Sequence, residues 1–160
     1  MSLTSPLSAM SKPAYLHCLY AEDVRQEVSG QLSVVGMFQG GLRVSEAPTR
    51  LPKLAVIANL FVTHKPASVR LEVYQDDKVL QTVQPPPEFI QAVQAEPDTG
   101  LEEGYHMQFV VGFTDFAVPF AARLRVRAIV DEETIDGNAL VIQVGEETPP
   151  GRADLAAAQA

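Results

Sequence analysis

The sequence predicts an all-β domain, folded as an antiparallel β-sandwich of seven or eight strands of the immunoglobulin-like or C2-like kind. Short segments rich in Val, Ile and aromatic residues recur at turn spacings that are typical of sandwiches. Several segments alternate apolar and polar residues, as half-buried antiparallel strands do. No strong amphipathic helix separates them, which disfavours a parallel α/β sheet.

The length of 160 residues fits one domain whose core needs no metal or disulfide. We expect a flexible leader at 1–13, a single β-sandwich domain at 14–144 and a disordered tail at 145–160. The first residues lack the basic start and apolar core of a secretory signal, and no apolar run approaches the roughly 18 residues of a membrane span. With its single cysteine, Cys18, the chain is expected to be soluble and cytoplasmic.

The most distinctive stretch runs from Tyr15 to Phe38 and indicates two apolar strands joined by a charged connection. The first strand carries apolar groups on both faces, which places it inside a sheet. Charged residues at 22–27 interrupt it, a Ser-Gly turn follows, and the second strand covers 31–38. Gly36 within that strand indicates a bulge or a close approach of backbone.

The middle of the chain continues the strand pattern. Residues 42–44 suit a short edge piece of a sheet. Residues 47–52 contain two prolines and suit a loop. The strongly apolar run 53–64 favours a strand over a helix because of its β-branched residues. A hairpin of two alternating strands at 68–75 and 78–84 is the most secure local prediction, with Asp76-Asp77 as its turn.

Three prolines at 85–87 end that sheet, because they lack the amide protons a ladder requires. Residues 88–95 fit either a short helix or an edge strand, and 96–104 an acidic loop. Strands are expected at 105–113 and 122–130, with an irregular stretch around Pro119 between them. A turn at 131–134 and a final run that reaches Val144 complete the domain.

Composition and motifs exclude several function classes. The net charge of -8 and the pI near 4.8 disfavour nucleic acid and anionic membranes as partners. No motif of a hydrolase, a nucleotide-binding protein or a metalloprotease is present, so we expect no enzyme and no cofactor. His17, His64 and His106 fall on separate predicted strands rather than in a metal-ligand spacing, and Cys18 fits an inert core thiol.

Two sets of charged residues are candidates for recognition. Asp23 and Arg25 share a face of an extended chain, where they could pair or bind an outside group; alternatively Asp23 caps a turn and Arg25 braces a neighbouring strand. Arg123, Arg125 and Arg127 form a row with roughly 7 Å between neighbours. That row could clamp a carboxylate, a phosphate or an acidic partner, or could be a solvated face paired with acidic residues.

Acidic turns raise a further possibility, calcium, which takes six to eight oxygen ligands in proteins. If the strands simply alternate in direction, the turn at Asp76 and Asp77 and the loop at Asp115 share one end of the sandwich. Asp131 and Asp136 are further candidates, and Asp131 would lie at the opposite end. The absence of Trp disfavours a carbohydrate-binding sandwich.

The segment from Leu16 to Phe38 resembles the opening of a family of small bacterial β-rich proteins of unknown function. The shared features are a strand, an acidic-Asp-Val-Arg step, a Gly-containing turn and a Val-Gly-Met-Phe strand. The resemblance implies a bacterial cytosolic β-rich domain and carries no activity.

The sequence therefore favours a non-enzymatic acidic β-sandwich that binds an unknown protein partner or associates with itself. The candidate interaction residues are Asp23, Arg25, Arg123, Arg125 and Arg127. The alternative is a sandwich that binds a small ligand or calcium through the loops near Asp76, Asp77 and Asp115.

Overall fold

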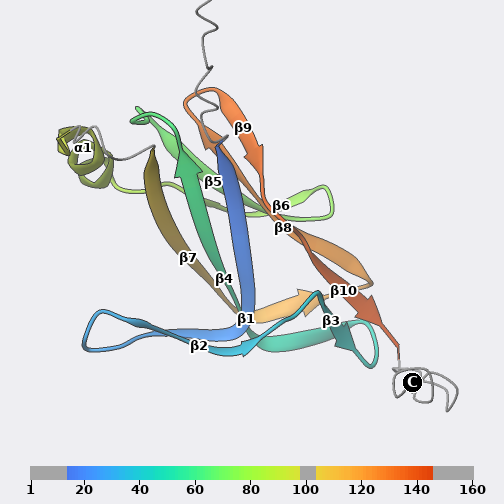
Figure 1. Ribbon diagram of the computed structural model, residues 1–160. Coiled ribbons are helices and arrows are strands. Elements are labelled where there is room, and N and C mark those ends of the chain that lie inside the picture. The colour runs from blue at the N-terminus through green and yellow to red at the C-terminus, as the bar shows by residue number, and fades with distance from the viewer. Residues whose placement is uncertain (1–13, 98–103, 146–160) are drawn as a thin grey trace, which may run out of the picture.

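The computed structural model describes residues 14–97 and 104–145, in which ten strands and one helix form a two-sheet β-sandwich (Figure 1). The all-β sandwich predicted from the sequence is confirmed. The described residues form ten strands rather than seven or eight. The short strand β3 (Gly41–Val44) matches the edge piece expected at 42–44, whereas β9 (Glu133–Asp136) begins where a turn was expected. The expected leader at 1–13 and the tail beyond residue 145 lie outside the described residues.

One layer is a four-stranded antiparallel sheet with the order β2-β1-β4-β7. Its strands are β1 (Tyr15–Gln26), β2 (Leu32–Met37), β4 (Thr49–Val62) and β7 (Tyr105–Val118). The long pairing of β4 with β7 runs from Thr49 opposite Val118 to Val62 opposite Tyr105. β2 and β7 are therefore the two edges of this sheet.

The other layer is a six-stranded sheet with the order β3-β10-β8-β5-β6, to which β9 is added beside β8. Its remaining strands are β5 (Val69–Gln75), β6 (Lys78–Val83), β8 (Ala122–Val130) and β10 (Leu140–Val144). The predicted hairpin of β5 and β6 is confirmed. β3 and β10 pair in parallel, so this sheet is mixed rather than purely antiparallel as predicted.

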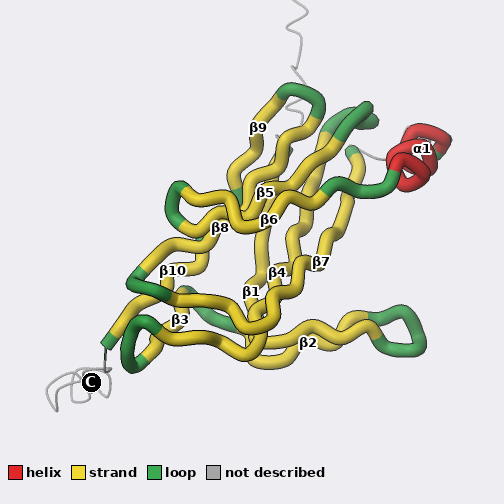
Figure 2. Tube along the Cα trace, turned by 180° about the vertical axis from the view of Figure 1, so that it is seen from behind, coloured by secondary structure: helices red, strands yellow, loops and turns green. Residues whose placement is uncertain are grey.

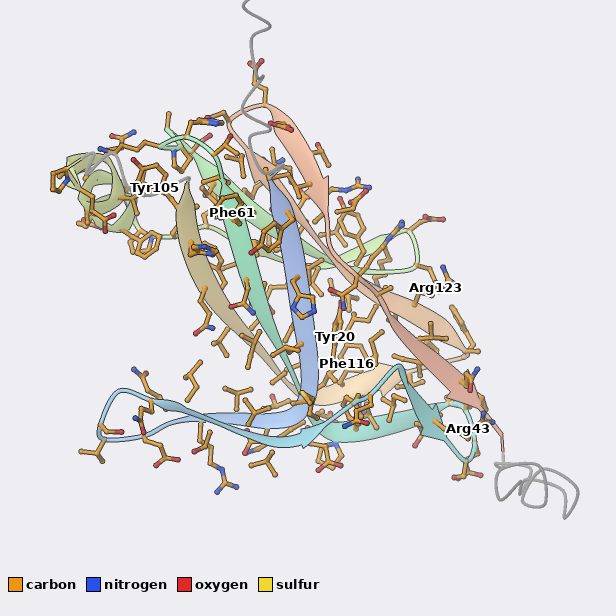
Figure 3. The ribbon with its side chains drawn as sticks, viewed as in Figure 1. Tyr20, Arg43, Phe61, Tyr105, Phe116 and Arg123 are labelled. Atoms are coloured by element: carbon orange, nitrogen blue, oxygen red, sulfur yellow. The ribbon has the colours of Figure 1, made fainter. Side chains whose placement is uncertain are left out.

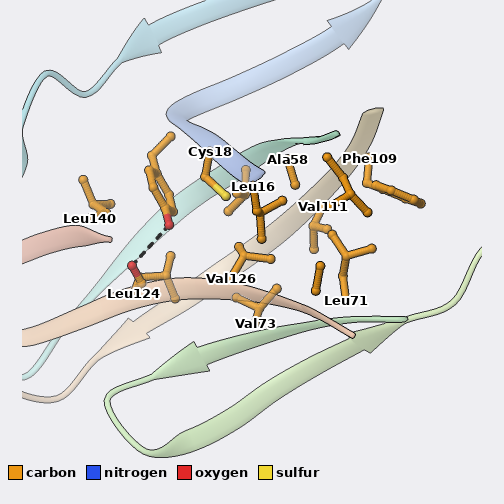
Figure 4. Close-up of a cluster of buried hydrophobic side chains, with 14 of the residues drawn as sticks. Leu16, Cys18, Ala58, Leu71, Val73, Phe109, Val111, Leu124, Val126 and Leu140 are labelled. Atoms are coloured by element: carbon orange, nitrogen blue, oxygen red, sulfur yellow. Dashed lines mark hydrogen bonds between the residues drawn. The ribbon is translucent and has the colours of Figure 1, made fainter. Parts of the chain in front are cut away.

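The core lies between the sheets and is built from the inward-facing alternate residues of the long strands. Leu16, Cys18 and Tyr20 of β1 face Leu124 and other apolar residues of β8 (Figure 4). The dashed line in Figure 4 marks the bond that the Tyr20 hydroxyl donates to the carbonyl of Leu124, at 3.3 Å. Among the described residues no charged or polar residue is buried as a whole. Burial of this apolar area is the main favourable term in the folding free energy.

Three strands extend further than the sequence indicates. β1 continues through the charged residues to Gln26 because Asp23 and Arg25 pair with Val35 and Ser33 of β2. β4 begins at Thr49, inside the predicted loop 47–52. Pro52 is tolerated there, because on its β1 side this part of β4 has no ladder that would need an amide proton.

β7 also continues beyond the predicted end at Phe113, through Asp115, which adopts a left-handed φ of 54°. Residues 88–95, whose sequence fits either a short helix or an edge strand, belong to the helix α1 (Pro87–Ala95). Its residues Ile90 and Val93 are buried. The helix lies beside the upper end of β7, where the rings of Phe89 and Phe109 meet edge to face at 6.2 Å (Figure 1). α1 has nine residues, and no helix in the described ranges is long and apolar enough to cross a membrane.

Candidate functional site

The β1–β2 hairpin separates from the rest of the four-stranded sheet at Ala21. Residues 15–21 of β1 pair with β4, whereas residues 21–26 pair with β2 alone. Ala21 belongs to both ladders, opposite Ala55 on one side and Met37 on the other. Beyond Ala21 the hairpin projects from the body of the sandwich (Figures 1 and 2). We call residues 22–40 the arm.

The arm carries apolar side chains that the fold leaves uncovered. No residue from 22 to 40 is buried. Val34, Val35 and Met37 of β2 are 40%, 42% and 49% exposed, and Val28 at the tip is fully exposed. Phe38, at the end of the arm, is partly buried against the core, but packing does not explain the exposed side chains of Val28, Val34, Val35 and Met37.

After Ala21, residues 22–26 of β1 no longer pair with residues 49–54 of β4, and the two segments diverge. We call the space between these two segments the fork. A hollow of about 420 Å³ lies in this fork. Its wall is partly charged and partly apolar, formed by Glu22, Asp23, Arg25, Val35, Phe38, Leu42, Leu51, Pro52 and Lys53. A smaller hollow of about 250 Å³ shares Glu22, Asp23 and Lys53 with it and extends over Val110 and Gly112 of β7. The two hollows therefore flank the ion pair of Asp23 with Lys53.

Asp23 bridges the fork. Its Oδ2 accepts a hydrogen bond from Arg25 Nε at 3.1 Å and one from Lys53 Nζ at 3.2 Å. The hydrogen bonds from Arg25 and Lys53 lower the pKa of Asp23 below its ordinary value, so the carboxylate is ionised at neutral pH. The Asp23 side chain is only 19% exposed, whereas both cations are more than half exposed. Each cation can therefore reach a bound group without leaving Asp23.

Of the alternatives for Asp23 and Arg25, the pair on one strand face is the observed one. Asp23 does not cap a turn, because the turn lies further along, at Glu27 to Gln31, where Glu27 N–H donates to the Gln31 carbonyl. Sequence reasoning did not find Lys53 as the third member of the site. Lys53 is 30 residues away, and only the register of β1 against β4 brings it beside Asp23.

Gly36 fits the arm for a local steric reason, as the expectation of a close approach anticipated. Its φ of +64° is left-handed, and a Cβ at this position would lie 2.7 Å from the Glu22 side chain. The missing side chain allows Glu22 to lie across β2. Glu22 thereby reaches the wall of both hollows.

The predicted arginine row is present on the outer face of β8, but its members differ in surroundings. Arg127 Nε donates to Asp136 Oδ1 at 2.7 Å, which fits the alternative of a paired, solvated face. Arg125 lies 3.8 Å from Asp77. For Arg123, the described residues supply no carboxylate within ion-pair distance. The row is therefore neutralised at one end and open at the other.

The aspartates proposed for calcium do not gather. Asp76 Oδ1 accepts the Arg123 N–H at 3.0 Å, and Asp115 Oδ1 accepts Arg50 Nε at 2.5 Å. Within residues 14–97 and 104–145, no three His, Cys, Asp or Glu side chains are close enough to hold a metal ion. The calcium hypothesis thus lacks the converging oxygens that it requires.

Cys18 is buried in the core, as predicted. Burial is the main cause that raises the pKa of its thiol to about 12, against a smaller opposing effect of a hydrogen bond with Tyr20. A thiol with this pKa is protonated at neutral pH and is a poor nucleophile.

No model of a known protein family matches this chain, and searches of curated proteins and solved structures likewise return no match.

Proposed function

We propose that this protein is a non-enzymatic interaction module that binds an extended segment of a partner protein along the free edge of β2. The observation that carries the proposal is the arm, whose edge strand is uncharged, exposed and apolar on both faces. An extended segment that adds to a sheet edge gains main-chain hydrogen bonds, and its alternate side chains select the sequence.

β2 differs from the other described edges in how it is protected. Natural proteins shield edge strands with charge, proline, a bulge, short length or a covering element. β3 has four residues and carries Arg43, and β6 begins with Lys78 and is followed by prolines. β7 has α1 beside Phe109. The sequence of β2, LSVVGM, has no charge and no proline, which supports a partner at this edge.

The fork supplies specificity next to that edge. Val35 lies opposite Asp23 and lines the larger hollow. The Val35 face of β2 therefore borders the partly charged, partly apolar hollow whose wall includes Arg25 and Lys53, and partner side chains on that face point to the same side of the sheet. An apolar side chain followed by an acidic one fits this arrangement, because the first fills the hollow and the second meets the two cations.

The features that support this proposal also argue against catalysis at the fork. Asp23 is held ionised by two cations and is a poor proton donor or acceptor near neutral pH. We keep the expectation of a cytoplasmic protein, for which the support is the unpaired, buried thiol of Cys18. The expectation of a bacterial protein depends on the resemblance of residues 16–38 alone.

Selection of peptides from a random display library tests the proposal. We expect the wild-type protein to enrich peptides with alternating apolar residues and an acidic residue, and Val35→Lys to lose them. Val79→Lys is the matched control, because Val79 has the similar exposure of 45% and lies on an edge of the other sheet. Both variants must unfold cooperatively at the same urea concentration as the wild type.

Two outcomes decide against the proposal as stated. If the Val35→Lys variant binds the selected peptides as tightly as the Val79→Lys variant, β2 is not the docking edge. A wild-type protein that dimerises in sedimentation equilibrium, with dimerisation lost in Val35→Lys, shows that the occupant of β2 is a second copy of the chain rather than a different protein.

A further inference from the structure

The outer face of the six-stranded sheet concentrates positive charge in an acidic protein. Five of the eight arginines in the chain project from this face, Arg43 on β3, Arg70 on β5, and Arg123, Arg125 and Arg127 on β8. The register places them on one side, because residues opposite each other in adjacent strands share a face. The residues that alternate with them on β8, such as Leu124 and Val126, point into the core. Arg43 and Arg123 lie on the same side of the molecule in Figure 3.

Two of these arginines are neutralised by carboxylates of the same face. Arg127 pairs with Asp136 at 2.7 Å, and Arg70 Nε lies 3.2 Å from Glu72 Oε1. These two pairs account for the positive charge at one end of the face. They leave little attraction for an external anion there.

The other three arginines lie toward the opposite end of this face, and among the described residues only Arg125 has a carboxylate within ion-pair distance. Arg43 donates to the neutral Oε1 of Gln143 at 2.7 Å. Arg43 lies opposite Gln143 on β10 and Arg123 lies opposite Val141, so the two arginines flank β10 on the same face and are offset by two residues along it. Arg125 has Asp77 at 3.8 Å, but that carboxylate is fully exposed and weakly held. Among the described residues, Arg43, Arg123 and Arg125 thus form an open cationic cluster.

An aromatic ring restrains the cluster on its inner side. The guanidinium of Arg125 lies 5.9 Å from the centre of the Tyr74 ring, and that of Arg127 lies 5.2 Å from the same ring. Cation–π contact of this kind limits the conformations of a long side chain. Less side-chain entropy is then lost when Arg125 binds a ligand.

We propose that the Arg43, Arg123 and Arg125 cluster binds an extended acidic polypeptide segment, with Asp or Glu at alternate positions. Arg123 and Arg125 are two residues apart on one strand, a separation of roughly 7 Å, which equals the spacing of alternate side chains on an extended chain. Each guanidinium can then take one carboxylate in a two-hydrogen-bond contact. An extended polypeptide with alternate carboxylates can satisfy both arginines at once without bringing the two guanidinium groups together. This surface is on the opposite sheet from β2 and does not depend on the function proposed for the arm.

Fluorescence anisotropy with a labelled peptide of alternating Glu and Ser tests the inference. We expect saturable binding at low salt that weakens as salt is raised, since exposed ion pairs are screened. Peptides with Gln in place of Glu, and peptides with Glu at every third position, should bind more weakly. In the second peptide, successive carboxylates fall on opposite faces of an extended chain.

Variants locate the site. Removal of one exposed ion pair in Arg123→Gln should weaken binding by about threefold, and Arg123→Gln with Arg125→Gln by about tenfold. Arg50→Gln is the control, because it also removes one exposed arginine but from β4 of the other sheet. An equal loss in Arg50→Gln overturns the inference, as does a peptide affinity that does not depend on the Glu spacing. If inorganic pyrophosphate displaces the labelled peptide at a lower concentration than the unlabelled peptide does, the cluster binds a phosphate ligand rather than a polypeptide.

Discussion

The side-chain amide of Asn138 makes two hydrogen bonds with the backbone of Cys18. Asn138 Oδ1 accepts the Cys18 N–H at 2.7 Å, and Asn138 Nδ2 donates to the Cys18 carbonyl at 2.9 Å. The single proton of the Tyr20 hydroxyl is directed mainly to the Asn138 carbonyl at 2.7 Å and is shared with the more distant Leu124 carbonyl at 3.3 Å. This part of β1 has β4 on one side only, so the amide takes the place of a missing strand and joins the two sheets.

We expect Asn138→Ala to destabilise the protein by about 2–3 kcal/mol, because it leaves the backbone N–H and carbonyl of Cys18 without partners in a partly buried position. Urea unfolding measures the change. Gln108→Ala is the control, since its amide bonds with Asn59 on the exposed outer face and should cost less than about 0.5 kcal/mol. Equal effects in the two variants would contradict a role of Asn138 in joining the sheets.

Asp131 should make stability depend on acid pH. Partial burial acts to raise its pKa, but hydrogen bonds from the Ser68 N–H, His64 and the Ala67 N–H outweigh it, and the pKa lies below the ordinary 3.8. A lowered folded-state pKa means that the contribution is complete above about pH 3.8 and is lost as the pH falls through the folded-state value.

The variant Asp131→Asn tests this, since Asn also tolerates the φ of 53° at this position. We expect it to be less stable than the wild type at pH 7 and the difference to shrink below pH 3.8. Unfolding midpoints in urea between pH 7 and pH 2.5 give the comparison. A difference that stays constant over this range would mean that the Asp131 charge does not contribute.

Gly36→Ala should destabilise the pairing of β2 with β1 by about 1–2 kcal/mol, because a left-handed conformation costs this much for a residue with a Cβ. Contact with the Glu22 side chain should add to that cost. Gly30→Ala is the control, because its φ is +85° but no atom lies within 4 Å of the added Cβ. Hydrogen exchange of the β2 amides should accelerate more in Gly36→Ala than in Gly30→Ala, and Glu22→Ala should remove the excess. Equal acceleration in both glycine variants would exclude the Glu22 contact.

Cys18 should react with a disulfide reagent only when the core opens. Burial raises its pKa to about 12, so the thiolate is scarce at pH 8. We expect slow labelling of the native protein and rapid stoichiometric labelling in urea above the unfolding midpoint. Complete labelling within seconds under native conditions would show that the space between the sheets is open to solvent.

The features predicted well from the sequence depend on neighbouring residues. The β5–β6 hairpin follows from strict alternation around the turn at Asp76, and the pair of Asp23 with Arg25 follows from a spacing of two on one strand. Pairings between distant segments were missed. Lys53 reaches Asp23, and Asn138 reaches Cys18, only through the register and packing of strands that are far apart in the chain.

Local signals misled the prediction where tertiary pairing overrides them. The charges at 22–27 indicate a connection and the prolines at 47–52 a loop, yet residues 22–26 belong to β1 and residues 49–52 to β4. In each case the strand has a partner on one side and is open on the other, so charge and proline cost little. These are also the segments that border the fork.

The parallel pairing of β3 with β10 has a consequence for the order of assembly. Residues 41–44 meet residues 141–144, which are synthesised 100 residues later. During translation from the N-terminus, β3 has no sheet to join until the last described strand leaves the ribosome. The neighbouring arm needs only its own two strands and can close early. A truncation that removes β10 would therefore also release β3, at the opposite end of the domain in sequence.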